Sequence, residues 1–531
     1  MRKNTRWTWM LLACVGLQAH AQALPAAAPA TAETGLFKDV PAPWREYLLQ
    51  ARRAEGIEDP LQRCLAYPDL PGNRWPAGHA RAHCLDHAVR AMSMDDARAL
   101  LDAGRAGELE AYLRRLEAEH VRPVDPSEEL HYFYQQFGSE DADAFTAAWL
   151  AVQPDSPYAQ TARAHFHSGR ARRARGGKWA SETAPEDLRR MTAEYDLALP
   201  LYRSAVRLAP RFIVAWNGML SLAYRDSRGA LEQEAFTAAN AIEPGCQDLV
   251  DIRMTALQPR WGGSYEAMLA YAEQLKPLLA TRPILAREVA APFGDRGDRL
   301  IASEQLDREA LEILEVAVLT GSNEDYLDDA ANVAFNAKDG AEDAWRALGY
   351  LLQLARFKDG GWWANVNIAR MLVRQEPFVA HHYATLAVAA KPENAASHYY
   401  LAASSYNTKR FDEADKHYQL AMQDASYLRS SLDELVRMWM FDAGLSPKAG
   451  SLRARPYIDR LVREFPDDGR GRIYRIQSAW AIDGTVPDQL VVDFEQRVDP
   501  QDPPQARFLG WVREFRKARP PRPATPPARG D

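Results

Sequence analysis

The sequence has few cysteines, no excess of positive charge and no long apolar segment. Four of its 531 residues are cysteine, so it lacks a dense disulfide framework. Its 65 Lys and Arg face 72 Asp and Glu, a net charge of −7, which gives no sign of a nucleic-acid-binding protein. No stretch reaches the roughly 20 apolar residues that a transmembrane helix needs, so we expect no membrane span.

Motifs that identify enzymes and metal sites are also missing. The sequence has no H-E-x-x-H or G-x-S-x-G pattern. The stretch Gly176-Gly177-Lys178 is followed by Trp179, without the Ser or Thr of a phosphate-binding loop. His83 and His87 are four residues apart, but a metal site needs three or four converging ligands. We therefore expect no catalytic residue, no cofactor and no metal.

Residues 1–21 have the features of a secretory signal peptide. Basic residues precede an apolar stretch from Trp7 to Leu17, and the pattern Ala19-His20-Ala21 suits signal peptidase. Cleavage after Ala21 would release a periplasmic or secreted protein. In an alternative interpretation, Leu11-Leu12-Ala13-Cys14 is a lipoprotein processing site and Cys14 carries a lipid anchor.

Apolar residues recur every three or four positions through most of the chain, which predicts helices. The helices also repeat with a period of 34 residues. The matched positions are Ala205 and Ala239, Pro210 and Pro244, Ala380 and Ala414, and Ala387 and Ala421. Helical pairs with this period, in which bulky and small residues interlock, resemble tetratricopeptide repeats. We predict an all-α fold, an α-solenoid of tetratricopeptide-like helical hairpins with an irregular helical C-terminal part.

One repeat is longer than the others. Its second helix is expected to end 34 residues after Pro154 but ends at Pro210, and the surplus runs roughly from Gly169 to Arg190. We interpret the surplus as an insertion at a turn between two helices, a place that often belongs to the binding face. The stretch Pro259 to Ser264 echoes its tryptophan and paired glycines. The candidate partner-binding residues are Arg175, Lys178, Trp179, Arg260, Trp261 and Tyr265.

The insertion is also rich in charge. Its basic residues are Arg170, Arg172, Arg173, Arg175 and Lys178, and its acidic residues are Glu182, Glu186 and Asp187. Because the acids offset much of the positive charge, we expect a solvated face with local ion pairs. The functional alternative is a contact with a carboxylate-rich partner or an anionic lipid.

Three pieces of the sequence resemble one protein family. They are "ALLDAGRAGELEAYL" (Ala99 to Leu113), "ARGGKWASE" (Ala174 to Glu182) and "LQPRWGGSYEAML" (Leu257 to Leu269). Together they are similar to bacterial proteins that share domain of unknown function 4034, over approximately Asp95 to Leu279. The resemblance implies a helical, tetratricopeptide-like fold and implies no activity or catalytic residue.

The predicted organisation follows from these patterns. It consists of a signal peptide (1–21), a flexible leader (22–40), an N-terminal helical segment (41–94), a helical repeat domain similar to family 4034 (95–320), tetratricopeptide-like repeats (321–428), a C-terminal helical region (429–515) and a disordered tail (516–531). Cys64 and Cys84 bracket a turn-rich segment, and in an exported protein they are expected to form a disulfide. Cys246 is expected to be a buried thiol.

The sequence favours a non-catalytic scaffold that binds a protein or peptide in the cell envelope. The alternatives are a cell-envelope hydrolase with its site in the C-terminal region and a structural assembly factor of an envelope complex. A cleft with two or more buried carboxylates would favour an enzyme. A groove lined by exposed aromatic and Asn or Arg side chains would favour a binding protein. No feature of the sequence indicates an oligomeric state.

Overall fold

The structure is a computed structural model that describes residues 36–122, 126–177, 180–338, 343–358 and 360–518. The predicted signal peptide, with Cys14, lies outside these residues, as do Lys178, Trp179 and most of the leader and tail. The described residues form helices and no strand. No helix among them is long and apolar enough to cross a membrane.

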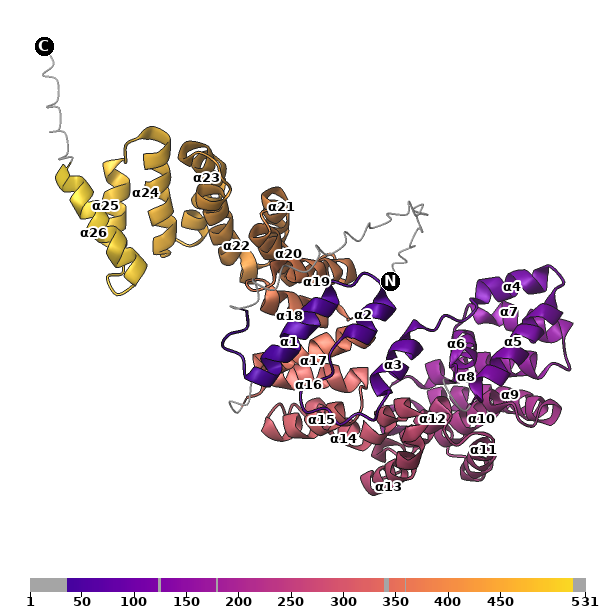
Figure 1. The fold of residues 1–531 in the computed structure, drawn as a ribbon. Helices are drawn as coiled ribbons and strands as arrows, with labels where there is room; N and C mark the ends of the chain where they lie inside the picture. The colour runs from indigo at the N-terminus through magenta and orange to yellow at the C-terminus, as the bar shows by residue number, and fades with distance from the viewer. Residues whose placement is uncertain (1–35, 123–125, 178–179, 339–342, 359, 519–531) are drawn as a thin grey trace, which may run out of the picture.

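The helices follow one another along a curved array (Figure 1). The first part contains α1 (Ala42–Glu55), α2 (Pro60–Ala66), α3 (His79–Ala88), α4 (Met94–Asp102), α5 (Ala106–His120), α6 (Glu129–Gln135), α7 (Ala142–Val152), α8 (Pro157–Arg175) and α9 (Pro185–Leu208). The middle part contains α10 (Ile213–Arg225), α11 (Gly229–Ile242), α12 (Gln247–Ala256), the 3₁₀ turn η4 (Pro259–Trp261), α13 (Tyr265–Leu275), α14 (Ala286–Ala302), α15 (Arg308–Thr320), α16 (Glu324–Asn336) and α17 (Ala344–Phe357). The last part contains α18 (Trp362–Leu372), α19 (Pro377–Ala390), α20 (Ala395–Asn407), α21 (Phe411–Ala421), α22 (Ala425–Arg437), α23 (Pro447–Glu464), α24 (Gly469–Asp483), α25 (Asp488–Arg497) and α26 (Pro503–Ala518).

Pairs of antiparallel helices make up the array, as the 34-residue period predicts. Helices α9 and α11 end two residues before Pro210 and Pro244, because a proline ring cannot continue a helix without breaking its hydrogen bonds. In the later pair, the small residues Ala402 of α20 and Ala414 of α21 are fully buried, so the helices pack closely. The protein is an α-solenoid of tetratricopeptide-like hairpins.

The extended repeat differs from its prediction. The surplus residues 169–190 are not simply an added loop, because α8 continues through residue 175 and α9 already starts at residue 185. The chain reverses within residues 176–184, where Gly176 adopts a φ of 67°. Alanine and arginine favour helix, and the paired glycines mark only the turn. The insertion is therefore mainly a longer hairpin.

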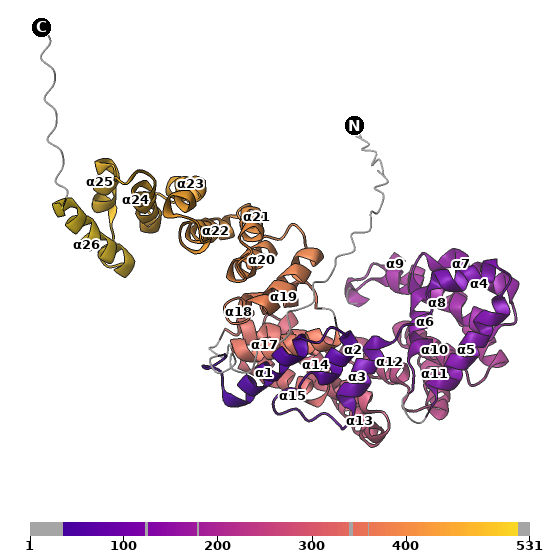
Figure 2. The same ribbon diagram turned by 45° about the horizontal axis from the view of Figure 1, so that its top comes forward.

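The first three helices do not pack as a separate N-terminal segment. Figures 1 and 2 show α1 to α3 lying across α14 to α17, which are more than two hundred residues away in the sequence. Trp44 packs edge-on against Tyr350 of α17, with their ring centroids 5.8 Å apart. The hydroxyl of Tyr47 donates a hydrogen bond to the carbonyl of Gly349 at 3.1 Å. The N-terminal helices share one hydrophobic core with the middle of the array.

A disulfide and a buried arginine hold this N-terminal layer. Cys64 of α2 and Cys84 of α3 are bonded, with their Cα atoms 5.7 Å apart. Arg356 of α17 donates to the carbonyl of Cys64 at 2.8 Å and forms an ion pair with Asp69 at 2.8 Å. Cys246 is a buried free thiol. The disulfide links α2 to α3 within the N-terminal layer, and Arg356 connects this layer to α17 of the solenoid.

Both predicted flexible ends begin inside ordered structure. Phe37 and Val40, placed in the leader by its Ala- and Pro-rich composition, are buried against the second core. The amide of Phe37 donates to the side chain of Gln375 at 3.0 Å. At the other end, α26 continues to Ala518, past the start predicted for the tail. Apolar side chains near each end of the described residues, such as Phe37 and Val512, pack on the array.

Candidate partner-binding surfaces

The two sequence stretches predicted to bind a partner meet in the structure. Arg175, the last residue of α8, lies with its guanidinium carbon 4.7 Å from the centre of the Trp261 ring in η4. Tyr224 of α10 packs edge-on against the same ring at 5.1 Å. Arg260 and Arg225 lie 5.5 and 5.9 Å from it. We call Trp261, Tyr224, Arg175, Arg225 and Arg260 the Trp261 cluster.

Two glycines shape the turn that carries Trp261. Gly262 follows η4 with a φ of 93°, a conformation that side chains with a Cβ rarely adopt. A Cβ on Gly263 would lie 2.0 Å from the carbonyl oxygen of Leu257. Ser264 then caps α13 by accepting a hydrogen bond from the amide of Ala267 at 3.2 Å. The "WGGS" stretch therefore ends one helix, presents the indole and starts the next helix.

Tyr265 is half-buried and packs on the hydrophobic core between α12 and α14. Burial and the nearby Asp295 carboxylate raise the pKa of Tyr265 to about 12. The structure therefore gives this residue a packing role beside the Trp261 cluster. Lys178 and Trp179 lie outside the described residues, so their part in the prediction stays a prediction.

Two residues of the basic run at the end of α8 form local ion pairs. Arg170 forms an ion pair with Glu194 of α9 at 3.1 Å, and His167 contacts the same carboxylate at 2.8 Å. Arg173 pairs with Glu140 at 2.7 Å. The two arginines and their carboxylate partners line a hollow of about 840 Å³ between the turn and the two long helices. The ion pairs balance much of its charge, so this hollow is a weak candidate for an anion-binding site.

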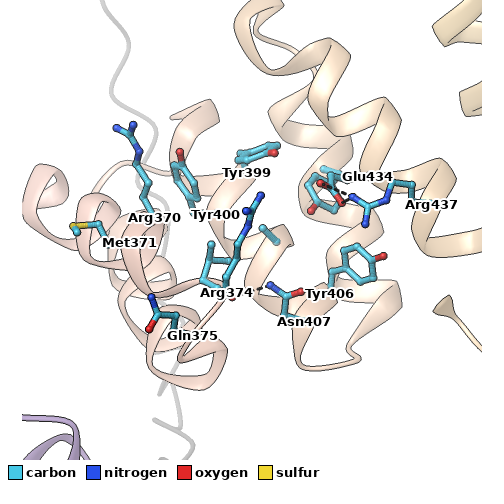
Figure 3. Close-up of a pocket in the computed structure, with 13 residues that line it drawn as sticks. Arg370, Met371, Arg374, Gln375, Tyr399, Tyr400, Tyr406, Asn407, Glu434 and Arg437 are labelled. Carbon is cyan, nitrogen blue, oxygen red and sulfur yellow. Dashed lines mark hydrogen bonds and ion pairs between the residues drawn. The ribbon is translucent and has the colours of Figure 1, made fainter. Parts of the chain in front are cut away.

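A second surface, which the sequence analysis did not identify, lies between α18, α20 and α22. It is a groove of about 610 Å³ (Figure 3). Its lining comes from the end of α18 and the following turn (Arg370, Met371, Val373, Arg374 and Gln375), from α20 and α21 (Tyr399, Tyr400, Ala403, Tyr406, Asn407 and Tyr418) and from α22 (Glu434 and Arg437). We call it the tyrosine–arginine groove.

The polar groups of this groove are only partly satisfied within the protein. Glu434 and Arg437 form an ion pair at 3.3 Å, and Asn407 donates to the carbonyl of Val373 at 2.7 Å. Arg370 and Arg374 are exposed and form no ion pair with any carboxylate in the described residues. The hydroxyl of Tyr418 is buried and has no hydrogen-bond partner in the described part of the chain. A ligand with an acceptor group would satisfy these donors.

The spacing of the groove residues in the sequence can be interpreted only once the helix boundaries are known. Tyr399 and Tyr406 are seven residues apart and lie along one face of α20. Arg370 lies near the end of α18, and Arg374 lies in the turn that follows it. By contrast, Trp362 and Trp363, which stand out in the sequence, pack internally. Trp362 donates to Ser397 at 2.8 Å, and Trp363 packs edge-on against Phe335.

Ionisable side chains also gather between α6, α12 and α14. His131 contacts Asp248 at 3.2 Å, and Asn217 donates to Asp248 at 2.9 Å. Burial opposes the charge of His131, but Asp248 outweighs it and raises the pKa of His131 to about 9. Burial and the carboxylate of Asp251 raise the pKa of Glu288 to about 8. These contacts connect successive hairpins.

No family model and no curated protein matches this chain. Three similar solved structures are a chain of the APC/C hetero-tetramer Cut9–Hcn1 (10% identity, 89% of this chain and 96% of that chain, TM-score 0.30), the P58(IPK) TPR domain (14%, 72% and 94%, 0.22) and yeast Tom70 (12%, 77% and 96%, 0.20). The fold class rests on the hairpins described above rather than on these alignments. The similarity to family 4034 stays a prediction.

Proposed function

We propose that the protein is an exported, non-catalytic scaffold that binds a segment of a partner protein in the tyrosine–arginine groove. The observation that carries this proposal is the lining of the groove, where Arg370, Arg374 and the buried hydroxyl of Tyr418 lack partners in the described residues. Tyrosine and arginine are among the side chains most enriched at the centres of protein interfaces.

The dimensions of the groove suit a short extended segment. Neighbouring packed helices lie about 8–10 Å apart, so a path across α18, α20 and α22 measures about 20 Å. An extended chain advances about 3.3–3.6 Å per residue, so roughly six residues fit. Backbone carbonyls of the segment would accept hydrogen bonds from the tyrosines, and its acidic groups would face Arg370 and Arg374.

The alternative hypothesis predicts an enzyme site in the C-terminal region. The aspartates of this region described below have a structural role instead. They hold neighbouring helices together through ion pairs with arginines. The pairs are Asp433 with Arg470 (3.4 Å), Asp459 with Arg475 (3.0 Å), Asp468 with Arg429 (2.8 Å) and Asp493 with Arg472 (3.4 Å). Carboxylates engaged in this way are poor general acids or bases, so the arrangement supports the scaffold.

Selection from a random peptide display library tests the groove directly. The full-length chain is expected to enrich a set of peptides that the double variant Arg370→Gln/Arg374→Gln binds at least about tenfold more weakly, since two charge-assisted contacts are lost. The matched control is Arg460→Gln/Arg463→Gln, which changes two arginines of α23. Equal binding by the groove variant and the control would exclude the groove as the binding site.

The proposal of export rests on residues 1–21, on the oxidised Cys64–Cys84 pair and on the resemblance to the bacterial family. Expression with the native leader in a bacterium, followed by fractionation and N-terminal sequencing, is expected to give a periplasmic or secreted chain that starts at Gln22. Incorporation of labelled palmitate that is lost in Cys14→Ser would instead identify a lipoprotein. A cytoplasmic chain that retains Met1 would contradict export.

A further inference from the structure

The first described residues of the chain lie at the edge of the tyrosine–arginine groove. The amide of Phe37 donates a hydrogen bond to Oε1 of Gln375 at 3.0 Å, and Gln375 lines the groove. The carbonyl of Leu36 accepts a hydrogen bond from Arg45 at 3.2 Å. Both sides of the peptide group between Leu36 and Phe37 are therefore held. Residues 22–35, which we call the leader segment, join the described part of the chain beside a groove residue.

This point of attachment is fixed by burial. Phe37 is 3% exposed and belongs to the same hydrophobic core as Leu372 near the end of α18. Its ring packs edge-on against Trp345 of α17, with the ring centroids 6.0 Å apart. A buried aromatic side chain holds the backbone next to it in one place. The leader segment therefore starts from a constant position relative to the groove.

The leader segment is long enough to cross the groove. Figure 3 shows Gln375 on one side of the groove and Glu434 and Arg437 on the other. The path across α18, α20 and α22 measures about 20 Å, which roughly six extended residues cover. Residues 30–35 supply these six. The reach therefore does not depend on where a signal peptide is cleaved.

The charge of the leader segment is opposite to that of the groove. Glu33 is its only charged residue. Among the described residues that line the groove, three are arginines and one is a carboxylate, Glu434, which pairs with Arg437 at 3.3 Å. Glu33 lies three residues before the held peptide group, so about 10 Å of extended chain brings its carboxylate toward Arg370 and Arg374.

The carboxylates around the groove are engaged by other groups. Among the described residues, none of them forms an ion pair with Arg370 or Arg374. Their partners are Arg470 (3.4 Å) and Tyr474 (2.9 Å) for Asp433, the hydroxyl of Tyr406 for Asp442, and the amide of Ser426 (2.8 Å) for Asp424. A carboxylate from the leader segment would be an additional partner for the two arginines.

The remaining residues of the leader segment suit an aromatic surface. Most are Ala or Thr, and Pro25 and Pro29 favour the extended polyproline II conformation, which leaves backbone carbonyls without internal hydrogen bonds. Grooves lined by aromatic side chains bind segments of this kind. The hydroxyl of Tyr418 is buried and has no hydrogen-bond partner in the described residues. A carbonyl of the leader segment would accept a hydrogen bond from it.

We propose that the leader segment docks in the tyrosine–arginine groove of its own chain and competes there with the partner. The proposal rests on the proposed function, because it takes the groove as the binding site and adds its regulation. A segment on a short tether has an effective concentration on the order of millimolar, so it occupies the groove even at low affinity. The apparent affinity of the partner then falls with the fraction of chains whose groove is free.

Photo-cross-linking in the full-length chain tests the docking without any partner. Benzoylphenylalanine, a photoreactive amino acid, is introduced at Ala32, and mass spectrometry identifies the cross-linked peptides. Cross-links to α20 or α22 are expected. Their yield is expected to fall about two- to fivefold in Arg370→Gln/Arg374→Gln, since an exposed charge contact is lost. The matched control Arg460→Gln/Arg463→Gln is expected to keep the wild-type yield.

The variant Glu33→Gln tests the competition. It is expected to raise the affinity of library-selected peptides about two- to fivefold, because the competing segment is weakened, whereas the groove variant lowers that affinity. A residue with a merely structural role would not raise it. The matched control is Glu58→Gln, which removes an exposed carboxylate between α1 and α2 and is expected to leave the affinity unchanged.

Three results would overturn the proposal. The first is the absence of cross-links from position 32 to α20 or α22. The second is cross-links that join labelled to unlabelled chains in a mixture, because they would assign the groove to the leader of a second copy. The third is equal peptide affinity in the wild type, Glu33→Gln and Glu58→Gln, because the leader would then not compete.

The two proposals fail in different ways. Cross-links to the groove in a chain that enriches no library peptide would contradict the proposed function and support the leader as the occupant of the groove. Peptide binding that depends on Arg370 and Arg374, without any cross-link from the leader, would support the proposed function and overturn its regulation by the leader.

Discussion

Acid is expected to loosen the attachment of α3, because His79 is buried there as a neutral imidazole. His79 is 1% exposed, with Nδ1 2.7 Å from the carbonyl of Pro283 and Nε2 2.7 Å from the hydroxyl of Ser322. The amide of Ser322 also donates to Nε2 at 3.2 Å, so this nitrogen acts as an acceptor. Burial lowers the pKa of His79 from 6.5 to about 3.

The sign and size of the effect follow from this shift. A group whose folded pKa is lowered contributes stability above its unfolded pKa, and this contribution is lost as the pH falls toward the folded pKa. For His79 the window runs from about pH 6.5 down to about pH 3, and the loss by pH 4 amounts to about 3 kcal/mol. Two neighbouring groups act in the same direction. Burial lowers the pKa of His83. Burial opposes the charge of Glu324, but its hydrogen bond with His83 and the charge of Arg287 outweigh burial and lower the pKa of Glu324 to about 2.

Hydrogen exchange measured for peptides of α3 at pH 7 and pH 4 provides the assay, because the free energy of local opening is obtained at each pH. The variant His79→Gln keeps polar atoms near Pro283 and Ser322 but does not titrate. The wild-type protein is expected to lose about 3 kcal/mol more than the variant between the two pH values. An identical pH dependence in both proteins would refute the role of His79.

Three further outcomes are expected. Cys64→Ser/Cys84→Ser is expected to lower stability by about 3 kcal/mol through loss of a 20-residue cross-link, and an unchanged melting temperature would contradict this. Gly263→Ala is expected to destabilise the turn, because its Cβ would lie 2.0 Å from a backbone carbonyl oxygen, whereas Gly177→Ala, with nothing within 4 Å, is expected to be neutral; equal melting temperatures for the two would count against the steric argument. Tyr418→Phe is expected to keep or raise stability by up to about 1 kcal/mol and to weaken peptide binding in the groove. Denaturant unfolding measures the stability and fluorescence anisotropy measures peptide binding; a less stable variant, or one that binds the peptide as tightly as the wild type, would contradict this prediction.

The helical hairpins could be predicted because the information that specifies them is local. Apolar spacing within each helix, small residues at the closest contacts and prolines after the helix ends all lie within one 34-residue period. The pairing of Cys64 with Cys84 is also a short-range prediction, and the structure joins the two residues. The same local signals led to a wrong prediction for the insertion. Gly176 and Gly177 indicated an inserted turn, whereas most of the surplus residues extend the helices on either side of it.

The binding surfaces could be predicted only in part. Arg175 and Trp261 were both predicted from the insertion and the stretch that echoes it, but their contact depends on the lengths of the hairpins between them. Tyr224, whose ring completes the Trp261 cluster, has the sequence pattern of an ordinary core residue. The tyrosine–arginine groove draws on residues from Arg370 to Arg437, and no single helix contains its pattern.

By itself, the sequence determined the repeating helical unit, because each hairpin satisfies its own backbone hydrogen bonds and interlocks its own side chains. Only the tertiary structure decided how α1 to α3 lie across α14 to α17, since those contacts join residues such as His79 and Ser322, 243 positions apart, and Tyr47 and Gly349, 302 positions apart, and depend on the shape of the finished array. The same holds for both candidate surfaces, where stacking of successive hairpins brings distant side chains together. Local chemistry specifies the units, and their packing creates the sites.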